Sequence, residues 1–146
     1  MAQNPPEGMP RVIPYLLYED VGRAIEWLGR AFGLTEKLRF TDDDGVVNHA
    51  DVRIDDGVIM LGNPGAGYAN PKRVGHATQL VAVYVDDVDE HFRRAKEAGA
   101  TILSEPEDQP YGERRYMAED PEGHQWHFAT HQRSVPPEEW GAKIAN

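Results

Sequence analysis

An approximate internal repeat constrains the fold of this chain more than any other feature of its sequence. A shift of 67 residues places "YEDV" (18–21) on "VDDV" (85–88), and it also places "VIMLG" (58–62) on "QWHFA" (125–129). Few residues are identical, but one register serves both segments without a gap. We therefore predict two modules that share one fold and arose by duplication.

The first half predicts a strand, a helix and then further strands. "RVIPYLLYED" is typical of a strand, and "DVGRAIEWLGRAFG" predicts a helix because Asp20 is a suitable N-cap and Gly33 a suitable residue after the last turn. The alternation in "VVNHADVRID" predicts a half-buried strand, and Asp56-Gly57 indicates a turn into the strand "VIMLG".

The second half repeats this order. "ATQLVAVYVDD" predicts a strand, and "DVDEHFRRAKEAGA" predicts a helix that begins with Asp87 and Glu90 at capping-box spacing. "TILSEP", "RRYMAED" and "QWHFATH" are expected to be strands, and the tail "SVPPEEWGAKIAN" to hold a short helix that docks through Trp140. The expected segments are an N-terminal arm (1–10), a first module (11–62), a Gly- and Pro-rich linker loop (63–76), a second module (77–131) and a C-terminal tail (132–146).

Composition excludes several functional classes. The 146 residues contain no cysteine, so disulfides, thiolate metal ligands and a cysteine nucleophile are excluded. The net charge of −10 argues against a nucleic-acid partner, because phosphate binding needs a basic face. No apolar run reaches the ~20 residues of a membrane helix, and "MAQNPPEGMP" lacks the apolar region of a signal peptide, so we expect a cytoplasmic protein without a membrane partner.

Two tandem βαβββ modules, with "VDDVDE" after one strand and "DPEGHQWHF" leading into the last, resemble the vicinal oxygen chelate superfamily of glyoxalases, bleomycin-resistance proteins and extradiol dioxygenases. The resemblance covers residues 11–131, and the ending "DPEGHQWHFATH" is most similar to the PhnB-like branch. It implies an α+β fold of curved mixed sheets that enclose a cup-shaped cavity, and it implies a homodimer.

The same resemblance indicates where a metal would bind. In the metalloenzymes of this superfamily, inward residues on the first and last strand of each module supply four ligands, and these positions correspond here to Ile13, Met60, Leu80 and His127. Isoleucine and leucine have no donor atom, and a thioether suits Cu(I) rather than Zn, Ni, Mn or Fe. We therefore expect no metal and no other cofactor.

The strand phases predict which residues line the cavity. Ala50 and Val52 take one face of their strand, so His49 takes the other, and the shift of 67 pairs His49 with Tyr116. The predicted catalytic residues are His127, His49 and Tyr116. The predicted ligand-binding residues are Tyr15, Met60, Tyr84, Arg114 and Gln125, with Arg53 beside Arg114 at the rim.

The other histidines of "DPEGHQWHFATH" are expected to have different roles. His127 and His131 share a strand face but lie about 13 Å apart, too far to share one ion. We expect His124 to bond local backbone at a turn, and His131 to be exposed or to bond the tail.

Three functions remain open at this point. The first is a metal-independent binding protein that holds an aromatic or partly apolar small molecule, cationic ones included, as bleomycin-resistance proteins do in antibiotic resistance. The second is a metal-independent lyase or isomerase with His127 or His49 as general base and Tyr116 as acid. The third and least favoured is a divalent-metal glyoxalase or dioxygenase.

Overall fold

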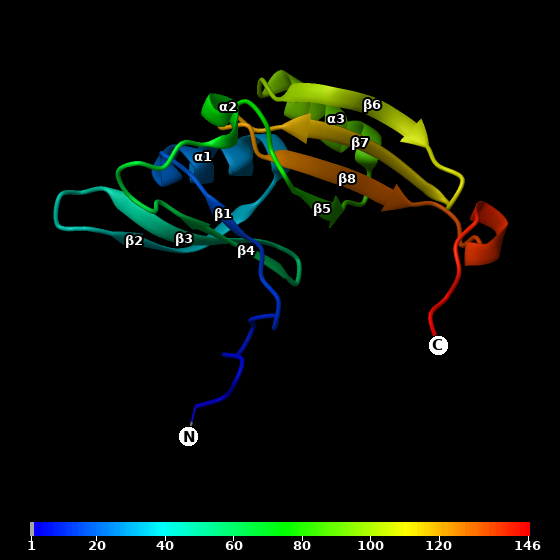
Figure 1. Ribbon diagram of the computed structural model, residues 1–146, viewed down its shortest axis with the longest axis horizontal. Helices are drawn as coiled ribbons and strands as arrows, with labels where there is room; N and C mark the ends of the chain where they lie inside the picture. Colours follow the sequence, from blue (N-terminus) through cyan, green and yellow to red (C-terminus); the bar gives the residue numbers. More distant parts are fainter. Residues whose placement is uncertain (1) are drawn as a thin grey trace.

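The computed structural model describes residues 2–146 and contains two modules of the same topology (Figure 1). The first module consists of β1 (Tyr15–Leu17), α1 (Val21–Phe32), β2 (Thr35–Thr41), β3 (Val47–Ile54) and β4 (Gly57–Gly62). The second consists of β5 (Leu80–Tyr84), α3 (Val88–Glu97), β6 (Thr101–Asp108), β7 (Glu113–Glu119) and β8 (Gln125–His131). Between them lies the short α2 (Pro71–Val74), and the 3-10 helix η1 (Pro137–Trp140) follows β8.

Each module forms one mixed four-stranded sheet, in the order β1-β4-β3-β2 or β5-β8-β7-β6. The first and last strands of a module pair in parallel, and the remaining pairs are antiparallel. Tyr15 pairs with Met60 in the first module, and Ala82 pairs with His127 in the second. The shift of 67 residues therefore relates both members of the first pair to those of the second. The predicted α+β fold of two tandem βαβββ modules is confirmed.

Local chemistry explains the ends of both long helices. The side chain of Asp20 accepts a hydrogen bond from the Arg23 amide at the start of α1, and Asp87 does the same for Glu90 at the start of α3. Gly33 follows α1 with φ 78°, a left-handed conformation that a glycine adopts without strain. The 3-10 helix η1 falls at the predicted terminal helix, where the ring of Trp140 lies 5.6 Å from that of Tyr111.

The core lies between the two helices and one face of each sheet. Its largest fully buried side chains are Trp126, Tyr18, Tyr116, Phe32, Phe128, Leu28 and Leu61. The two modules meet through the helices, where the indole nitrogen of Trp27 donates to the Ala98 carbonyl over 2.9 Å and Arg94 donates to the carbonyls of Gly29 and Arg30. Figure 1 shows α1 and α3 behind the two sheets, so neither of these helices covers the opposite sheet faces.

Candidate functional site

The candidate site is the face of each sheet that points away from the helices, which we call the open face. On the first sheet this face carries Tyr15, Leu38, Phe40, His49, Asp51, Arg53 and Met60, because Ala50, Val52, Ile59 and Leu61 point into the core. On the second sheet it carries Leu80, Ala82, Tyr84, Glu113, Arg115, Met117, Gln125 and His127. Large apolar side chains are solvent-exposed on both, Phe40 by 59% and Leu80 by 42%.

Three polar side chains on the first open face form a hydrogen-bonded chain. The phenol oxygen of Tyr15 lies 2.8 Å from Nδ1 of His49, and Nε2 of His49 lies 2.9 Å from a carboxylate oxygen of Asp51. His49 and Asp51 lie two residues apart on β3 and therefore share a face. The sequence placed Tyr15 and His49 on this face, but it did not connect them to each other or to Asp51.

His127 occupies the predicted position on the second open face. Its Nε2 atom is buried, and it has no hydrogen-bond partner among the described residues. Burial lowers the pKa of His127, nearby Arg115 lowers it further, and Glu113 partly opposes this. Burial and Arg115 therefore favour the neutral imidazole, whose Nε2 atom is unsatisfied among residues 2–146.

The predicted ligand-binding residues Met60, Tyr84 and Gln125 also lie on the open faces. The phenol of Tyr84 hydrogen-bonds the Glu113 carboxylate, and this contact raises the pKa of Tyr84. The amide of Gln125 donates to the Glu119 carboxylate over 3.4 Å. These strand phases follow from the alternation of buried and exposed residues in the sequence.

The prediction that Tyr116 lines the cavity was wrong. Tyr116 is fully buried in the core, where its hydroxyl donates to Nδ1 of His91 over 2.5 Å, and burial raises its pKa. The shift of 67 does not hold through β7: His49 pairs with Gly62, and the residue that pairs with the equivalent Ala129 is Arg115. The second module is thus one residue shorter before β7, and every β7 side chain changes face relative to the expected register.

Arg114 was misplaced for the same reason. It lies on the helix side of β7, where its guanidinium contacts the Asp89 carboxylate at 3.1 Å and the Asp108 carboxylate at 3.2 Å. Those carboxylates raise the pKa of Arg114. Arg115 takes the open-face position instead, and Arg53 lies on the open face of the first sheet as expected.

The superfamily's metal positions do not fit a metal ion in this chain. Met60 and His127 lie on separate sheets, and Ile13 and Leu80 supply no donor atom. Within residues 2–146, no three histidine or carboxylate side chains converge in a way that could hold an ion.

The "DPEGH" segment joins the two modules. The buried Asp120 carboxylate accepts hydrogen bonds from the Tyr18 hydroxyl at 2.6 Å, the Trp126 indole at 3.2 Å and the backbone amides of Glu122 and His124. Nε2 of His124 donates to the Leu17 carbonyl over 2.6 Å. His124 therefore bonds backbone in the other module rather than in its own turn, a long-range contact that the local sequence does not reveal.

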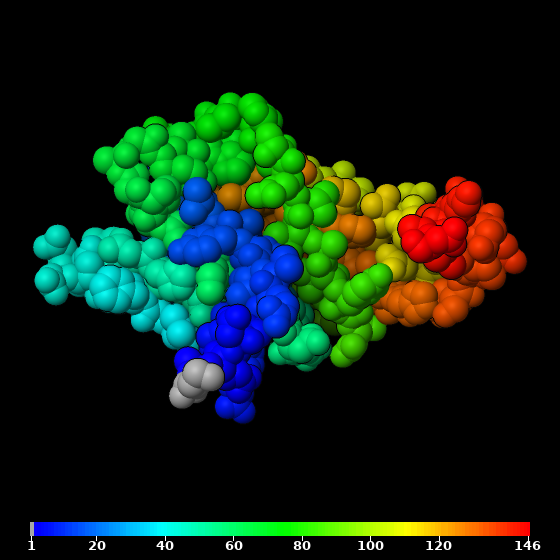
Figure 2. Space-filling model, turned by 60° about the horizontal axis from the view of Figure 1, so that its bottom comes forward, coloured from blue at the N-terminus to red at the C-terminus, as the bar shows by residue number. Residues whose placement is uncertain are grey.

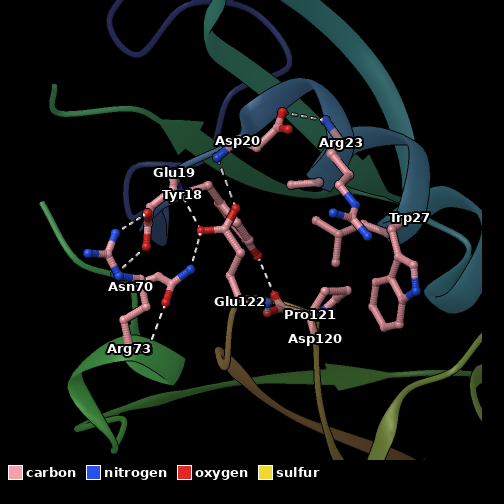
Figure 3. Close-up of a pocket in the computed structure, with 12 residues that line it drawn as sticks. Tyr18, Glu19, Asp20, Arg23, Trp27, Asn70, Arg73, Asp120, Pro121 and Glu122 are labelled. Carbon is pink, nitrogen blue, oxygen red and sulfur yellow. Dashed lines mark hydrogen bonds and ion pairs between the residues drawn. The ribbon is translucent and has the colours of Figure 1, made fainter. Parts of the chain in front are cut away.

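Glu122 also connects the "DPEGH" segment to the linker, and we call this set of contacts between the modules and the linker the joint (Figure 3). Its carboxylate accepts from the backbone amides of Glu19 at 2.6 Å and Asp20 at 3.0 Å, and from the Asn70 side chain at 2.9 Å. These residues border a hollow of about 250 Å³ between α1, α2 and the turn before β8. The carboxylates of Glu19, Asp120 and Glu122 at this hollow already accept hydrogen bonds from backbone amides and neighbouring side chains. The hollow is therefore part of the contact between the modules and is a weaker ligand site than the open faces.

A second hollow lies between the linker and β1. It has a volume of about 310 Å³, and its lining includes Tyr15, Leu17, Tyr68, Val74, His76 and His124. The Tyr68 hydroxyl donates to the Leu17 carbonyl over 2.7 Å, which holds the linker against the strand. Figure 2 shows the N-terminal segment, in blue, between the first module at the left and the second at the right.

Comparisons with known proteins agree with this architecture. Residues 11–128 match the model of a family described as the Glyoxalase/Bleomycin resistance protein/Dioxygenase superfamily. An uncharacterized protein of Mycobacterium bovis is 32% identical over 142 residues, which cover 94% of this chain and 93% of the relative.

Solved structures show the same similarity. The crystal structure of TioX from Micromonospora sp. ML1 is 39% identical, with a TM-score of 0.70 over 84% of this chain and 99% of that one. The fosfomycin resistance protein FosX of Listeria monocytogenes is 16% identical, with a TM-score of 0.61 over 90% of this chain and 97% of its own, and it shares the fold alone.

Proposed function

This chain belongs to the glyoxalase/bleomycin resistance protein/dioxygenase superfamily, and from that premise we propose that it is a metal-independent protein that binds a small organic molecule on its open faces. The observation that carries the proposal is the buried Nε2 atom of His127, which has no hydrogen-bond partner within residues 2–146. A buried polar atom without a hydrogen bond costs about 1–3 kcal/mol, and a ligand group that bonds the imidazole would recover this.

The surroundings of His127 indicate the chemistry of the ligand. Leu80, Met117 and Tyr84 offer apolar and aromatic contact area on the same face. Glu113 and Glu119 add negative charge there, Arg115 adds one positive charge beside His127, and the whole chain carries a net charge of −10. An aromatic or partly apolar molecule, with a cationic group favoured by these carboxylates, suits this combination.

A homodimer would complete the binding site. Leu38 and Phe40 share the open face of β2 and are 47% and 59% exposed, and Leu80 is 42% exposed on the second sheet, so each sheet offers apolar area to an associating chain. We propose that a second copy of the chain covers them, as in a cytoplasmic dimer of the PhnB-like branch. No helix among residues 2–146 has the length and apolar character to span a membrane.

Ligand binding can be tested without knowing the ligand. Native mass spectrometry of freshly purified protein is expected to show a dimer of the 16.4 kDa chain with additional bound mass. In a thermal-shift screen, flat aromatic amines are expected to raise the melting temperature more than the matching carboxylic acids.

Two alanine variants test whether His127 contributes to ligand affinity more than another histidine of the same strand does. A His127→Ala variant is expected to bind a hit from the screen at least 10-fold more weakly, which corresponds to ~1.4 kcal/mol. His131→Ala is the matched control, because that exposed side chain contacts Ser134 at the end of the same strand. Equal affinities for both variants, or no bound mass and no thermal shift with any compound, would refute the proposed function.

A further inference from the structure

We propose that Tyr15, His49 and Asp51 form a proton relay whose ligand-facing end is the Tyr15 phenol, and that this relay removes a proton from a carbon acid. The inference rests on the proposed function, since it requires that a small molecule enters beside the first sheet. It adds an activity to that binding, and it assigns a role to Asp51.

The two hydrogen bonds of His49 determine the direction of the relay. Asp51 as a carboxylate can only accept, so the proton on the imidazole is on Nε2, 2.9 Å from Asp51. Nδ1 is then unprotonated and accepts the hydroxyl proton of Tyr15 over 2.8 Å. Both ring nitrogens are therefore occupied, and the atom that meets a ligand is the phenol oxygen of Tyr15, not His49 as the sequence suggested.

Burial distinguishes the two ends of the chain. Asp51 is 5% exposed and Tyr15 is 48% exposed, with the His49 side chain between them at 28%. A carboxylate this deep stabilises a positive charge on its hydrogen-bonded partner more strongly than a surface carboxylate would. The carboxylate is therefore the buried end of the chain, and the phenol is the end open to a ligand.

Gly62 on the neighbouring strand β4 has no side chain and therefore leaves room for the Tyr15 ring. A Cβ atom at Gly62 would lie 2.7 Å from Cε1 and 2.8 Å from the hydroxyl of Tyr15, so the ring occupies the space above this glycine. Close backbone approach of this kind is a use for which glycine is suited. The phenol is thus held at His49 rather than free to turn into solvent.

A cavity of suitable size is lined in part by Tyr15. The hollow of about 310 Å³ between the linker and β1 is lined by Tyr15 and Leu17 on one side and by Tyr68 and Val74 on the other. This lining combines aromatic and aliphatic walls with polar side chains, among them His76, Thr78 and Gln79. It suits a flat molecule whose acidic C–H bond points at Tyr15.

The proposed step needs no metal and no redox partner. The Tyr15 oxygen takes a proton from a substrate carbon next to a carbonyl group, and the electron pair of that C–H bond becomes the enolate. The original phenol proton passes to Nδ1 of His49, which becomes an imidazolium paired with Asp51. Return of a proton to the other carbon completes an isomerisation, and loss of a leaving group completes an elimination.

The probe for this activity is 5-nitrobenzisoxazole, a flat aromatic carbon acid. When a base removes its ring C–H proton, the electron pair forms a C≡N bond, the N–O bond breaks and a coloured nitrophenolate is released. Wild-type protein is expected to accelerate this elimination. The variant Tyr15→Phe is expected to lower kcat about 100-fold, in the range of general-base effects, with little change in KM because the ring still packs above Gly62.

Asp51 is a positioning residue, and its test uses a readout that needs no turnover. Nitrogen NMR of wild-type protein is expected to show His49 protonated at Nε2 alone, while Asp51→Asn is expected to lose this preference together with kcat. His131→Ala is the control, and it is expected to keep both the Nε2 protonation of His49 and the wild-type kcat.

A wild-type rate no higher than that of Tyr15→Phe, or a His49 protonated at Nδ1, overturns the relay whatever the ligand screen finds. A failed ligand screen with an intact relay overturns only the proposed binding function at His127.

Discussion

Replacing Asp120 with alanine is expected to destabilise the protein more than any surface carboxylate replacement, because four donors converge on this buried side chain. Tyr18 is 1% exposed and Trp126 is 0% exposed, so neither can turn to water once the carboxylate is gone. Burial and the nearby carboxylate keep the Tyr18 phenol protonated by raising its pKa, and it therefore remains a donor without an acceptor.

The magnitude follows from the two fully buried donors. Each unsatisfied buried donor costs about 1–3 kcal/mol, so the hydroxyl of Tyr18 and the indole of Trp126 together account for about 2–6 kcal/mol. Burial raises the pKa of Asp120 itself, so removal of the carboxylate recovers part of its desolvation free energy. We therefore expect a loss of about 2–4 kcal/mol, which for a chain of this size lowers the melting temperature by roughly 10 °C.

Urea unfolding followed by tryptophan fluorescence measures this loss, because Trp27 and Trp126 are both buried in the native state. Asp120→Asn keeps one acceptor oxygen and is expected to lose about half as much. Asp43→Ala removes a carboxylate from an exposed turn, and its effect is expected to stay within about 0.5 kcal/mol. A loss below about 1 kcal/mol for Asp120→Ala would show that the joint around this residue does not stabilise the fold.

Two further predictions concern His91 and Gly62. Burial lowers the pKa of His91, which is held neutral between Tyr116 and the Phe32 carbonyl, so the unfolded chain binds a proton more readily. The free energy of unfolding should fall as the pH drops below 6.5, the ordinary pKa of histidine, and should fall less in His91→Gln; equal pH slopes would contradict this. Gly62→Ala should displace the Tyr15 ring and lower kcat for 5-nitrobenzisoxazole as Tyr15→Phe does, and an unchanged rate would mean that Tyr15 acts from another position.

Much of the fold could be predicted from periodicity and capping. The helices begin at Asp20 and Asp87 as their N-cap chemistry indicates, and the alternation around Ala50 and Val52 places His49 on the correct face. These are local properties, determined by residues within a few positions of one another. Strand β2 was not among the predicted strands, and all seven of its residues are exposed, so no alternation of buried and exposed positions marks it.

The errors in the second module have a different origin. Tyr116 and Arg114 were placed by a repeat register that β8 obeys and β7 does not, and a displacement of one residue reverses the face of every side chain on a strand. Nothing local marks the missing residue, because "RRYMAED" alternates equally well in either phase. The phase of β7 is decided by the space beneath α3, where Tyr116 meets His91.

The histidine-rich segment before and along β8 illustrates how a joint can be mistaken for a metal site. His124 donates to the Leu17 carbonyl, and Asp120 accepts from the Tyr18 hydroxyl. The turn before β8 in the second module therefore stabilises the C-terminal end of β1 in the first module. That support matters because β1 has only three residues and a single strand neighbour, β4. Tyr15 begins this short strand, so the turn that joins the modules also fixes the strand that presents the proposed relay to the cavity.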